Sequence, residues 1–235
     1  MNLDEYARMY AAEDSHWWYV GMRDATLGLL NGHLDNAAAE ARRQGDSHRP
    51  RILDAGCGTG GLLMHLDAMG WTAGIDLSPT ALAFARYRDL PHLAEASVES
   101  LPFPDATYDL VTCMDVLYHL QVHEDTTALA EFHRVLRPGG FFLFADLREV
   151  AEMPKLQALI AAQKGLEIVE QEDITAMVLA ALRGDEQRKR AMIDDLVPAN
   201  QRALFDEFAG LEGSKIMNGL ESRSIVYHRF VVKRV

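Results

Sequence analysis

The chain has no long apolar run, few cysteines and little positive charge. Its 235 residues hold 23 Lys and Arg against 35 Asp and Glu, and the net charge of −12 disfavours a nucleic-acid partner. No apolar stretch approaches a membrane span, and residues 1–5 lack a basic-then-apolar signal pattern, so we expect a cytoplasmic protein without membrane contact. The sequence contains no metal-ligand cluster, and we expect no metal.

The two cysteines lie in different contexts. Cys57 is in a glycine-rich segment and Cys113 is in an apolar one, so we expect no disulfide and a reducing compartment. A hydrophobic content of 49% is sufficient for a sizeable core in one large or two small domains. We expect a monomer or a homodimer.

The most informative segment present is residues 52–61, with the sequence ILDAGCGTGG. An apolar run followed by glycines is typical of a buried strand that breaks into a tight loop. Glycine permits unusual backbone angles there and lets a ligand approach the backbone closely. The pattern therefore predicts a nucleotide-like cofactor at the carboxyl end of a first strand, against Gly56, Gly58 and Gly60.

The glycine spacing alone leaves the cofactor open, because Gly56, Gly58 and Gly61 also fit the dinucleotide fingerprint G-x-G-x-x-G. Asp54 would repel a pyrophosphate and attract a cationic amine, which favours a ligand with an α-amino group and a sulfonium. Asp76 ends a second apolar run, where an acid is placed to bind ribose hydroxyls. A ribose is common to both cofactors, so Asp76 supports either of them.

These segments and three others resemble the class I S-adenosylmethionine-dependent methyltransferases. The matching segments cover roughly residues 50–150 in the family order, and they are 52–60, 74–78, 96–103, 111–119 and 135–140. Within the family the chain is most similar to the small-molecule branch, which includes quinone-biosynthesis and natural-product methyltransferases. The resemblance implies S-adenosyl-L-methionine as cofactor, S-adenosyl-L-homocysteine as product and a small-molecule acceptor.

The resemblance also implies which residues contact the cofactor. The family commonly has an acid at the position of Ser97, so here a serine hydroxyl would accept the bond from the adenine amino group. The Val98 amide would serve the adenine ring. The residues expected to bind the cofactor are Asp54, Gly56, Gly58, Gly60, Asp76, Leu77, Ser97, Val98, Glu99, Met114, Trp18 and Arg23.

Residues 16–19, with the sequence HWWY, hold two of the three tryptophans and precede the core. They could form a hydrophobic anchor for an N-terminal helix. In the family, N-terminal helices fold over the cofactor, and an aromatic face beside a sulfonium gains roughly 0.5–2 kcal/mol. We expect Trp18 to contact the cofactor, and His16, Trp17 and Tyr19 to line the substrate. Arg23 would reach the methionine carboxylate.

The candidate catalytic residues are His119 and Tyr118, in the loop after the expected fourth strand. Imidazole titrates near neutrality, so His119 could act as general base for a hydroxyl acceptor, or it could be a structural histidine. Tyr118 could orient or deprotonate the acceptor. Asp146 and Arg148 follow the fifth strand and are expected to line the substrate. Arg148 would suit an acidic or phenolate substrate, or it could pair with a neighbouring acid.

Short apolar segments alternate with helical ones over residues 50–172, which predicts a doubly wound parallel sheet. The expected strands are 51–55, 72–76, 93–97, 109–114, 140–146, 166–171 and 224–233. The resemblance implies a Rossmann-like, seven-stranded α/β sheet with an antiparallel strand 7, N-terminal helices and a helical cap between strands 6 and 7. The expected units are a lid segment (1–49), a cofactor-binding core (50–172 and 211–235) and a cap (173–210).

Methyl transfer from a sulfonium is an in-line displacement, so the protein mainly aligns the reactants and excludes water, which is worth up to ~7–11 kcal/mol. The expected reaction is methylation of a hydroxyl group on a natural-product-like metabolite. N- or C-methylation, a nicotinamide dehydrogenase and a non-catalytic binding or regulatory protein are the alternatives. A protein or nucleic-acid methyltransferase is disfavoured by the acidic charge.

Overall fold

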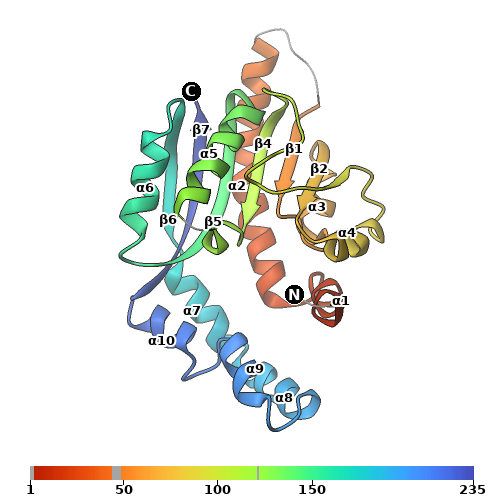
Figure 1. Ribbon diagram of the computed structural model, residues 1–235, viewed down its shortest axis with the longest axis vertical. Helices are drawn as coiled ribbons and strands as arrows, with labels where there is room; N and C mark the ends of the chain where they lie inside the picture. Colours follow the sequence, from red (N-terminus) through yellow and green to blue (C-terminus); the bar gives the residue numbers. More distant parts are fainter. Residues whose placement is uncertain (1–2, 44–48, 121) are drawn as a thin grey trace.

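The computed structural model describes residues 3–43, 49–120 and 122–235 (Figure 1). Within these ranges, the structure describes the backbone alone at residues 17, 18, 31, 34–43, 122–124, 196, 204 and 208. The described chain forms one central sheet with helices on both faces and a group of helices beyond one end of the strands (Figure 1).

The sheet has seven strands in the order β3-β2-β1-β4-β5-β7-β6. The strands are β1 (Arg51–Ala55), β2 (Trp71–Asp76), β3 (Leu93–Glu95), β4 (Tyr108–Met114), β5 (Leu136–Glu149), β6 (Leu166–Asp173) and β7 (Ile225–Arg234). Strand β7 is antiparallel to both of its neighbours, and the other pairings are parallel. The predicted fold class is therefore confirmed.

Strand β5 is longer than the expected 140–146. Leu136 pairs with Tyr108, the register then shifts, and Phe141 pairs with Leu110. Gly139, at φ 83°, lies in the inserted stretch, so a Pro-Gly sequence that reads as a loop forms a bulge within the strand. At its other end β5 pairs with β7 as far as Glu149.

Helices precede, connect and extend the sheet. Before it lie α1 (Leu3–Ala12) and α2 (Trp17–Arg43), and between the strands lie α3 (Gly61–Leu66), α4 (Pro79–Arg86), the 3₁₀ turn η1 (Leu117–His119), α5 (Val122–Val135) and α6 (Met153–Ala162). Between β6 and β7 lie α7 (Thr175–Gly184), α8 (Glu186–Leu196), α9 (Arg202–Phe208) and α10 (Lys215–Glu221). The predicted helical insertion is confirmed, with α10 as an addition after residue 210, whereas the division into lid, core and cap stays a prediction. None of the described helices has the length and apolar character to cross a bilayer.

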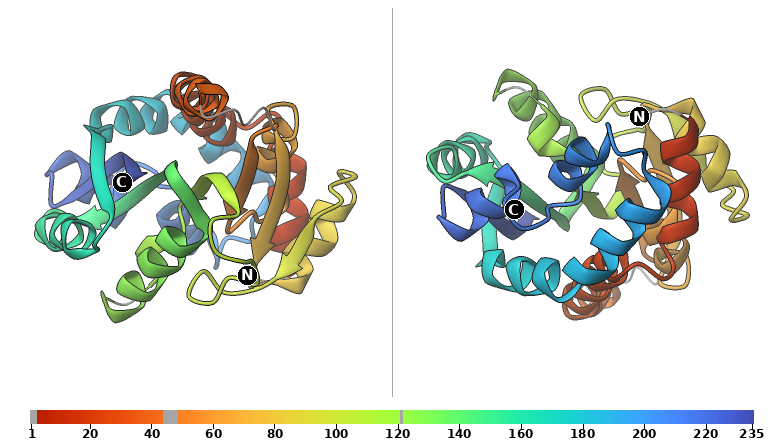
Figure 2. Two further views of the ribbon diagram at one scale, coloured as in Figure 1. Left: turned by 90° about the horizontal axis from the view of Figure 1, so that it is seen from above. Right: turned by 90° about the horizontal axis from the view of Figure 1, so that it is seen from below.

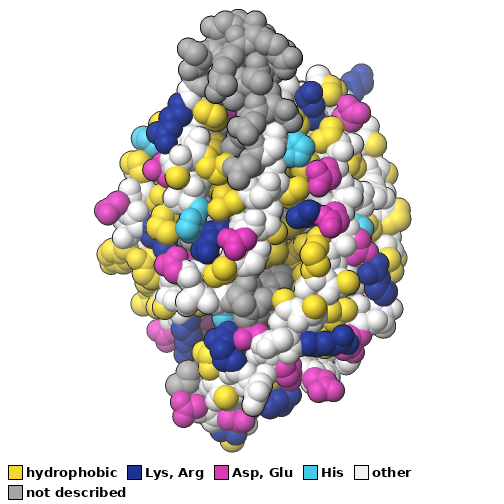
Figure 3. Space-filling view, turned by 180° about the vertical axis from the view of Figure 1, so that it is seen from behind, with side chains coloured by type: hydrophobic (Ala, Val, Ile, Leu, Met, Phe, Trp, Pro, Cys, Tyr) yellow, Lys and Arg dark blue, Asp and Glu magenta, His cyan; other side chains and the backbone are white. Residues whose placement is uncertain are grey.

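Both faces of the sheet are buried, as apolar parallel strands require. Ile52 belongs to an apolar cluster with Leu30 of α2, whereas the next residue, Leu53, belongs to a cluster with Phe132 of α5. Accordingly, α2 lies on one side of the sheet and α5 and α6 on the other (Figure 2). On the outer face seen in Figure 3, acidic and basic side chains are interspersed. With both faces covered, the ends of the strands are the natural place for a ligand.

The carboxyl ends of the parallel strands point toward α1 and α7 (Figure 1). The strand order reverses between β1 and β4, which is the topological switch point at which open α/β sheets bind ligands. His16, between α1 and α2, lies 3.7 Å from Asp185, between α7 and α8 (Nε2 to Oδ2). The N-terminal helices and the inserted helices thus meet beyond this edge.

Candidate active site

The loop after β1 depends on glycine for two reasons. Gly56, Gly58 and Gly60 have φ values of 87°, 54° and 87°, in the left-handed region. A Cβ on Gly56 would also lie 2.3 Å from the Cγ2 atom of Val116. The amides of Gly56 and Cys57 both donate to the carbonyl of Ile75 at 2.8 Å, which ties the loop to the end of β2.

The carboxylate of Asp76 organises the same loop from β2. Its Oδ2 accepts the Gly58 amide at 2.9 Å, and its Oδ1 accepts the Ser78 amide at 2.8 Å. Ser78 in turn caps α4 by accepting the Ala81 amide. Because each carboxylate oxygen has a second lone pair, the half-buried Asp76 retains capacity for ribose hydroxyls.

Asp54 lies at the switch point, and its side chain is buried. Its Oδ1 accepts the Thr112 hydroxyl at 2.7 Å. Burial raises the pKa of Asp54 to about 7, the Thr112 bond opposes that shift, and the charges of Glu13 and Asp76 add to it. A cation bound at the loop would favour the ionised form.

A group of polar and charged side chains joins α1 to the glycine loop. It is here called the Arg88 cluster and consists of the buried side chains of Arg88, Glu13 and Thr59 with the exposed side chain of Asp14. Arg88 Nη2 lies 3.0 Å from Glu13 Oε2, and Nη1 lies 3.1 Å from Asp14 Oδ2. Arg88 Nε also donates to the Thr59 carbonyl at 3.1 Å, and the Thr59 hydroxyl donates to Glu13 at 2.6 Å. The side chains of Arg88 and Glu13 are only 5% and 7% exposed. The sequence analysis did not identify this cluster.

Helix α1 contacts the glycine loop directly. A Cβ on Gly58 would lie 2.5 Å from Met9 Cε, and one on Gly61 would lie 2.6 Å from Glu13 Cδ. The Arg88 guanidinium also stacks over the Tyr10 ring, 4.4 Å from its centroid. The N-terminal helix therefore covers the loop that is expected to hold the cofactor.

The segment expected to contact adenine forms a tight turn after β3. The Ser97 hydroxyl accepts the Glu99 amide at 3.1 Å, and Val98 is buried. Leu77 is 69% exposed beside Asp76, so an adenine ring in this place would cover an apolar side chain that water now contacts.

A second group of polar side chains gathers where β4, β5 and β7 meet. The Tyr227 hydroxyl donates to Oδ1 of Asp115, the residue directly after β4. Burial raises the pKa of Asp115 to about 6, the Tyr227 bond opposes that shift, and the Asp146 charge adds to it. Asp115 directly follows Met114, which ends β4. Sequence analysis missed Asp115 and Tyr227, because nothing local in the sequence joins them.

Asp146 and Arg148, expected to line the substrate, form an ion cluster with Asp125. Arg148 donates to Asp146, and its two terminal nitrogens lie 3.0 and 3.1 Å from the Asp125 carboxylate. Asp146 is fully buried, and its Oδ1 has no hydrogen-bond partner in the described part of the chain. Burial raises the pKa of Asp146 to about 6. Arg148 thus pairs with neighbouring acids, which is one of the two alternatives that the sequence left open.

The candidate catalytic pair lies in η1, at the protein surface. The rings of Tyr118 and His119 are in contact, with centroids 3.9 Å apart. Burial, followed by the charges of Asp115 and Asp146, raises the pKa of Tyr118 to about 12. Burial alone lowers the pKa of His119, which favours a neutral imidazole at pH 7.

The N-terminal aromatic segment reaches both groups. Burial raises the pKa of Tyr19 to about 12, and the charges of Glu13 and Asp115 add to the shift. The His16 ring lies 5.8 Å from the Tyr19 ring. The side chains of Trp17 and Trp18 lie outside the described residues.

Arg23, expected at the methionine carboxylate, lies further along α2. Its Nε is 3.7 Å from Asp24 Oδ1, and its charge contributes to lowering the pKa of His65 on α3. This position faces α3, the helix that follows the glycine loop.

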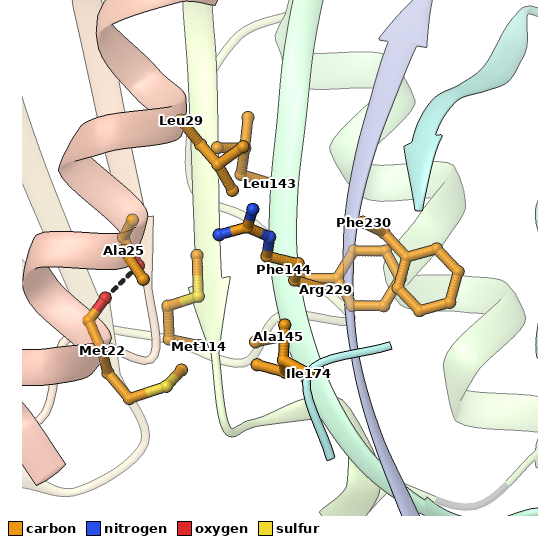
Figure 4. Close-up of a pocket in the computed structure, with 11 residues that line it drawn as sticks. Met22, Ala25, Leu29, Met114, Leu143, Phe144, Ala145, Ile174, Arg229 and Phe230 are labelled. Atoms are coloured by element: carbon orange, nitrogen blue, oxygen red, sulfur yellow. Dashed lines mark hydrogen bonds between the residues drawn. The ribbon is translucent and has the colours of Figure 1, made fainter. Parts of the chain in front are cut away.

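A small, largely apolar pocket lies between α2 and strands β4, β5 and β7 (Figure 4). Its volume of about 20 Å³ is room for about one water molecule. Met22, Met114 and Ile174 lie toward the carboxyl edge of the sheet, and the guanidinium of Arg229 points from β7 toward α2 (Figure 4). Arg229 pairs with Glu172, while its buried Nε has no hydrogen-bond partner among the described residues.

The structure thus brings the expected residues together in two places. The glycine loop, Asp54 and Asp76 meet at the ends of β1 and β2, and Tyr118, Asp146 and the unexpected Asp115 meet at the ends of β4 and β5. Within the described ranges, no three His, Cys, Asp or Glu side chains gather as metal ligands.

Comparison with known proteins points to one kind of chemistry. A family model described as "Methyltransferase domain" matches residues 53–144. The chain is 33% identical over 187 residues to the phthiotriol/phenolphthiotriol dimycocerosates methyltransferase of Mycobacterium tuberculosis, covering 77% of this chain and 68% of that protein. It is 31% identical over 171 residues to the fatty-acid O-methyltransferase of Mycolicibacterium smegmatis, covering 70% and 61%.

Among solved structures, the fold matches the O-methyltransferase of a trans-AT PKS multienzyme of Brevibacillus brevis, in complex with S-adenosyl-L-homocysteine. The TM-score is 0.61, with 19% identity over 80% of this chain and 68% of that chain. At this identity the likeness supports the fold alone.

Proposed function

Because the chain belongs to the class I S-adenosylmethionine-dependent methyltransferases, we propose that it transfers a methyl group to a hydroxyl oxygen of a small, largely apolar metabolite. S-adenosylmethionine is the methyl donor and S-adenosylhomocysteine the product. When bound, S-adenosylmethionine supplies an electrophilic methyl group on a sulfonium.

The residues at the ends of β1 and β2 fit this cofactor. Asp76 offers carboxylate oxygens to the ribose, and Leu77 offers an exposed apolar surface to the adenine. A Cβ on the loop glycines would meet neighbouring atoms at 2.3–2.7 Å, so the loop packs this closely against its neighbours only because these positions are glycine. Asp54, half-ionised near neutral pH, suits a ligand that carries positive charge.

The proposal that the acceptor is apolar rests on one observation. Next to the polar group at the ends of β4 and β5, residues of β5, α7 and α10 form a buried apolar cluster that includes Ala145, Val178 and Met217. Met22 of α2 and Met114 pack against it. A few polar groups set in an apolar surround are typical of sites for small organic ligands. The named substrates of both relatives, a dimycocerosate and a fatty acid, support the apolar character of the acceptor.

Calorimetric titration with S-adenosylhomocysteine, with NAD⁺ as the parallel ligand, tests the cofactor. We expect binding of S-adenosylhomocysteine alone, and its loss in Asp76→Ala, which removes the ribose acceptor and releases the Gly58 and Ser78 amides. No binding of S-adenosylhomocysteine would contradict the proposal and favour a non-catalytic protein.

Mass spectrometry after incubation with S-adenosylmethionine tests the acceptor. We expect a methylated product from dodecanol or para-dodecylphenol and none from dodecylamine. Methylation of dodecylamine alone would contradict O-methylation and indicate N-methylation, and the assignment of the cofactor would stand.

A further inference from the structure

Asp115 directly follows β4 at the carboxyl edge of the sheet. It lies at the switch point, and its φ of 57° turns the chain out of the strand. Its amide donates to the Ala145 carbonyl of β5 at 3.3 Å, so its backbone is fixed to the neighbouring strand. A carboxylate in this place is held by the sheet itself rather than by a surface loop.

Tyr227 orients this carboxylate. Its hydroxyl donates to Asp115 Oδ1, and its own amide donates to the buried Thr175 hydroxyl at 2.9 Å. Asp115 Oδ2 has no hydrogen-bond partner among the described residues, and it is not among their fully buried polar atoms. One carboxylate oxygen is thereby held, and the other can accept a proton from a ligand.

The titratable groups around Asp115 are acids, phenols and a thiol. Asp146 of β5 and Tyr227 of β7 shift the pKa of Asp115, and the Asp115 charge raises the pKa of Tyr118, Tyr19 and Cys113. The nearby cation, Arg148, is already shared between Asp146 and Asp125. A second carboxylate entering this group would be repelled, whereas a neutral hydroxyl would not.

We propose that Asp115, oriented by Tyr227, is the general base for a neutral hydroxyl acceptor, and that carboxylic acids are poor acceptors. This inference rests on the proposed methylation of an oxygen atom. As the acceptor oxygen bonds to the methyl carbon, the carbon–sulfur bond breaks and its electron pair stays on sulfur. The acceptor proton passes to Asp115 Oδ2, and the resulting carboxyl group later releases it to water.

His119 is the competing base, and the structure gives it fewer of the required features. It lies exposed in η1, and no carboxylate of the described chain contributes to its pKa shift. Asp115 has both a fixed backbone and an orienting partner, which a general base needs to meet a hydroxyl at hydrogen-bond distance.

Kinetics on para-dodecylphenol and dodecanol, with dodecanoic acid as the charged counterpart, test the inference. For Asp115→Asn we expect kcat to fall about 10²–10⁴-fold while S-adenosylhomocysteine binds as before. Asn accepts the left-handed conformation and still offers Tyr227 an acceptor, so this variant is expected to fold. Asp89→Asn is the matched control, since Asp89 is exposed and has the same φ of 57°; its kcat should equal that of the wild type.

The pH profile separates the two candidate bases. Wild-type kcat should fall as the pH drops through about 6, where Asp115 becomes protonated. The Tyr227 bond lowers the Asp115 pKa, so Tyr227→Phe should move this limb to higher pH, and the limb should persist in His119→Gln. A limb that disappears in His119→Gln and stays in Asp115→Asn would overturn the inference.

The remaining outcomes of the kinetic assays also test the inference. Turnover of dodecanoic acid in preference to both hydroxyl compounds would overturn the assigned acceptor class. Wild-type turnover with an unaffected Asp115→Asn would overturn the role of Asp115 and leave the proposed function intact. No methylation of either hydroxyl probe by the wild type would overturn both.

Discussion

The two halves of the site are built in different ways. The cofactor half, at the ends of β1 and β2, consists mainly of backbone: glycines at positive φ, and amides that donate to Asp76 and to Ile75. The proposed acceptor half, at the ends of β4, β5 and β7, consists of side chains from separate elements, with Asp115 and Tyr227 at its centre. A backbone site fixes one ligand, whereas a side-chain site can change its ligand by single substitutions.

Removal of Arg88 is the largest expected disruption of the cofactor half. Arg88→Ala leaves Glu13 buried without its partner, and loss of one member of a buried pair costs about 3–5 kcal/mol. Urea unfolding and calorimetry should show lower stability and weaker S-adenosylhomocysteine binding. Arg86→Ala, at an exposed position of α4, is the control. Equal stability of the two variants would mean that α1 is not held by this cluster.

Asp54 should make stability depend on pH. Its folded pKa of about 7 lies above the ordinary aspartate value of 3.8, so the stability that this group contributes at low pH is lost as the pH rises through 7. At 1.36 kcal/mol per pKa unit the loss is on the order of 4 kcal/mol. Asp54→Asn should therefore be more stable than the wild type at pH 8 and similar at pH 4. Parallel unfolding curves at every pH would contradict this.

Substitutions of glycine test how strongly the cofactor half depends on its backbone conformation. Gly56→Ala adds a strained φ and a clash with Val116, and each contribution is about 1–2 kcal/mol. Gly139→Ala has a similar φ of 83° and open space around its Cβ, so it should carry the strain alone. If Val116→Ala does not restore part of the stability of Gly56→Ala, the clash is not the cause.

The contact between the N-terminal helices and the inserted helices should have the smallest effect on stability. His16→Gln removes a partly exposed pair with Asp185, which is worth about 0–1 kcal/mol. Thermal unfolding should therefore change little. A large destabilisation would show that the N-terminal and inserted helices depend on each other more than this pair indicates.

The sequence predicts that the glycine loop and Asp76 meet, because the contacts between them are local. The residues from Gly56 to Asp76 lie on two consecutive strands, and the glycine spacing directly encodes the positive φ values. The strand order and the antiparallel last strand follow from the family resemblance. The expected start of the fifth strand, at residue 140, is wrong, because β5 begins at Leu136 and continues through the Pro-Gly stretch as a bulge.

The sequence does not predict the acceptor half or the Arg88 cluster, because both depend on long-range contacts. Asp115 and Tyr227 are 112 residues apart, and only the insertion of β7 beside β5 brings them together. Arg88 meets Glu13 across 75 residues through the docking of α1. Single acids, arginines and tyrosines carry no local pattern that marks such partners.

The position of β7 has a consequence for how the protein matures during synthesis. Strands β1–β4 and the glycine loop are translated first, so a nascent chain can form them while β7 is still unmade. Tyr227 then arrives with the last strand, between β5 and an already translated β6. The ribosome therefore delivers the ability to hold the methyl donor before the ability to use it, and a chain interrupted before residue 225 would retain the donor loop without a completed reaction centre.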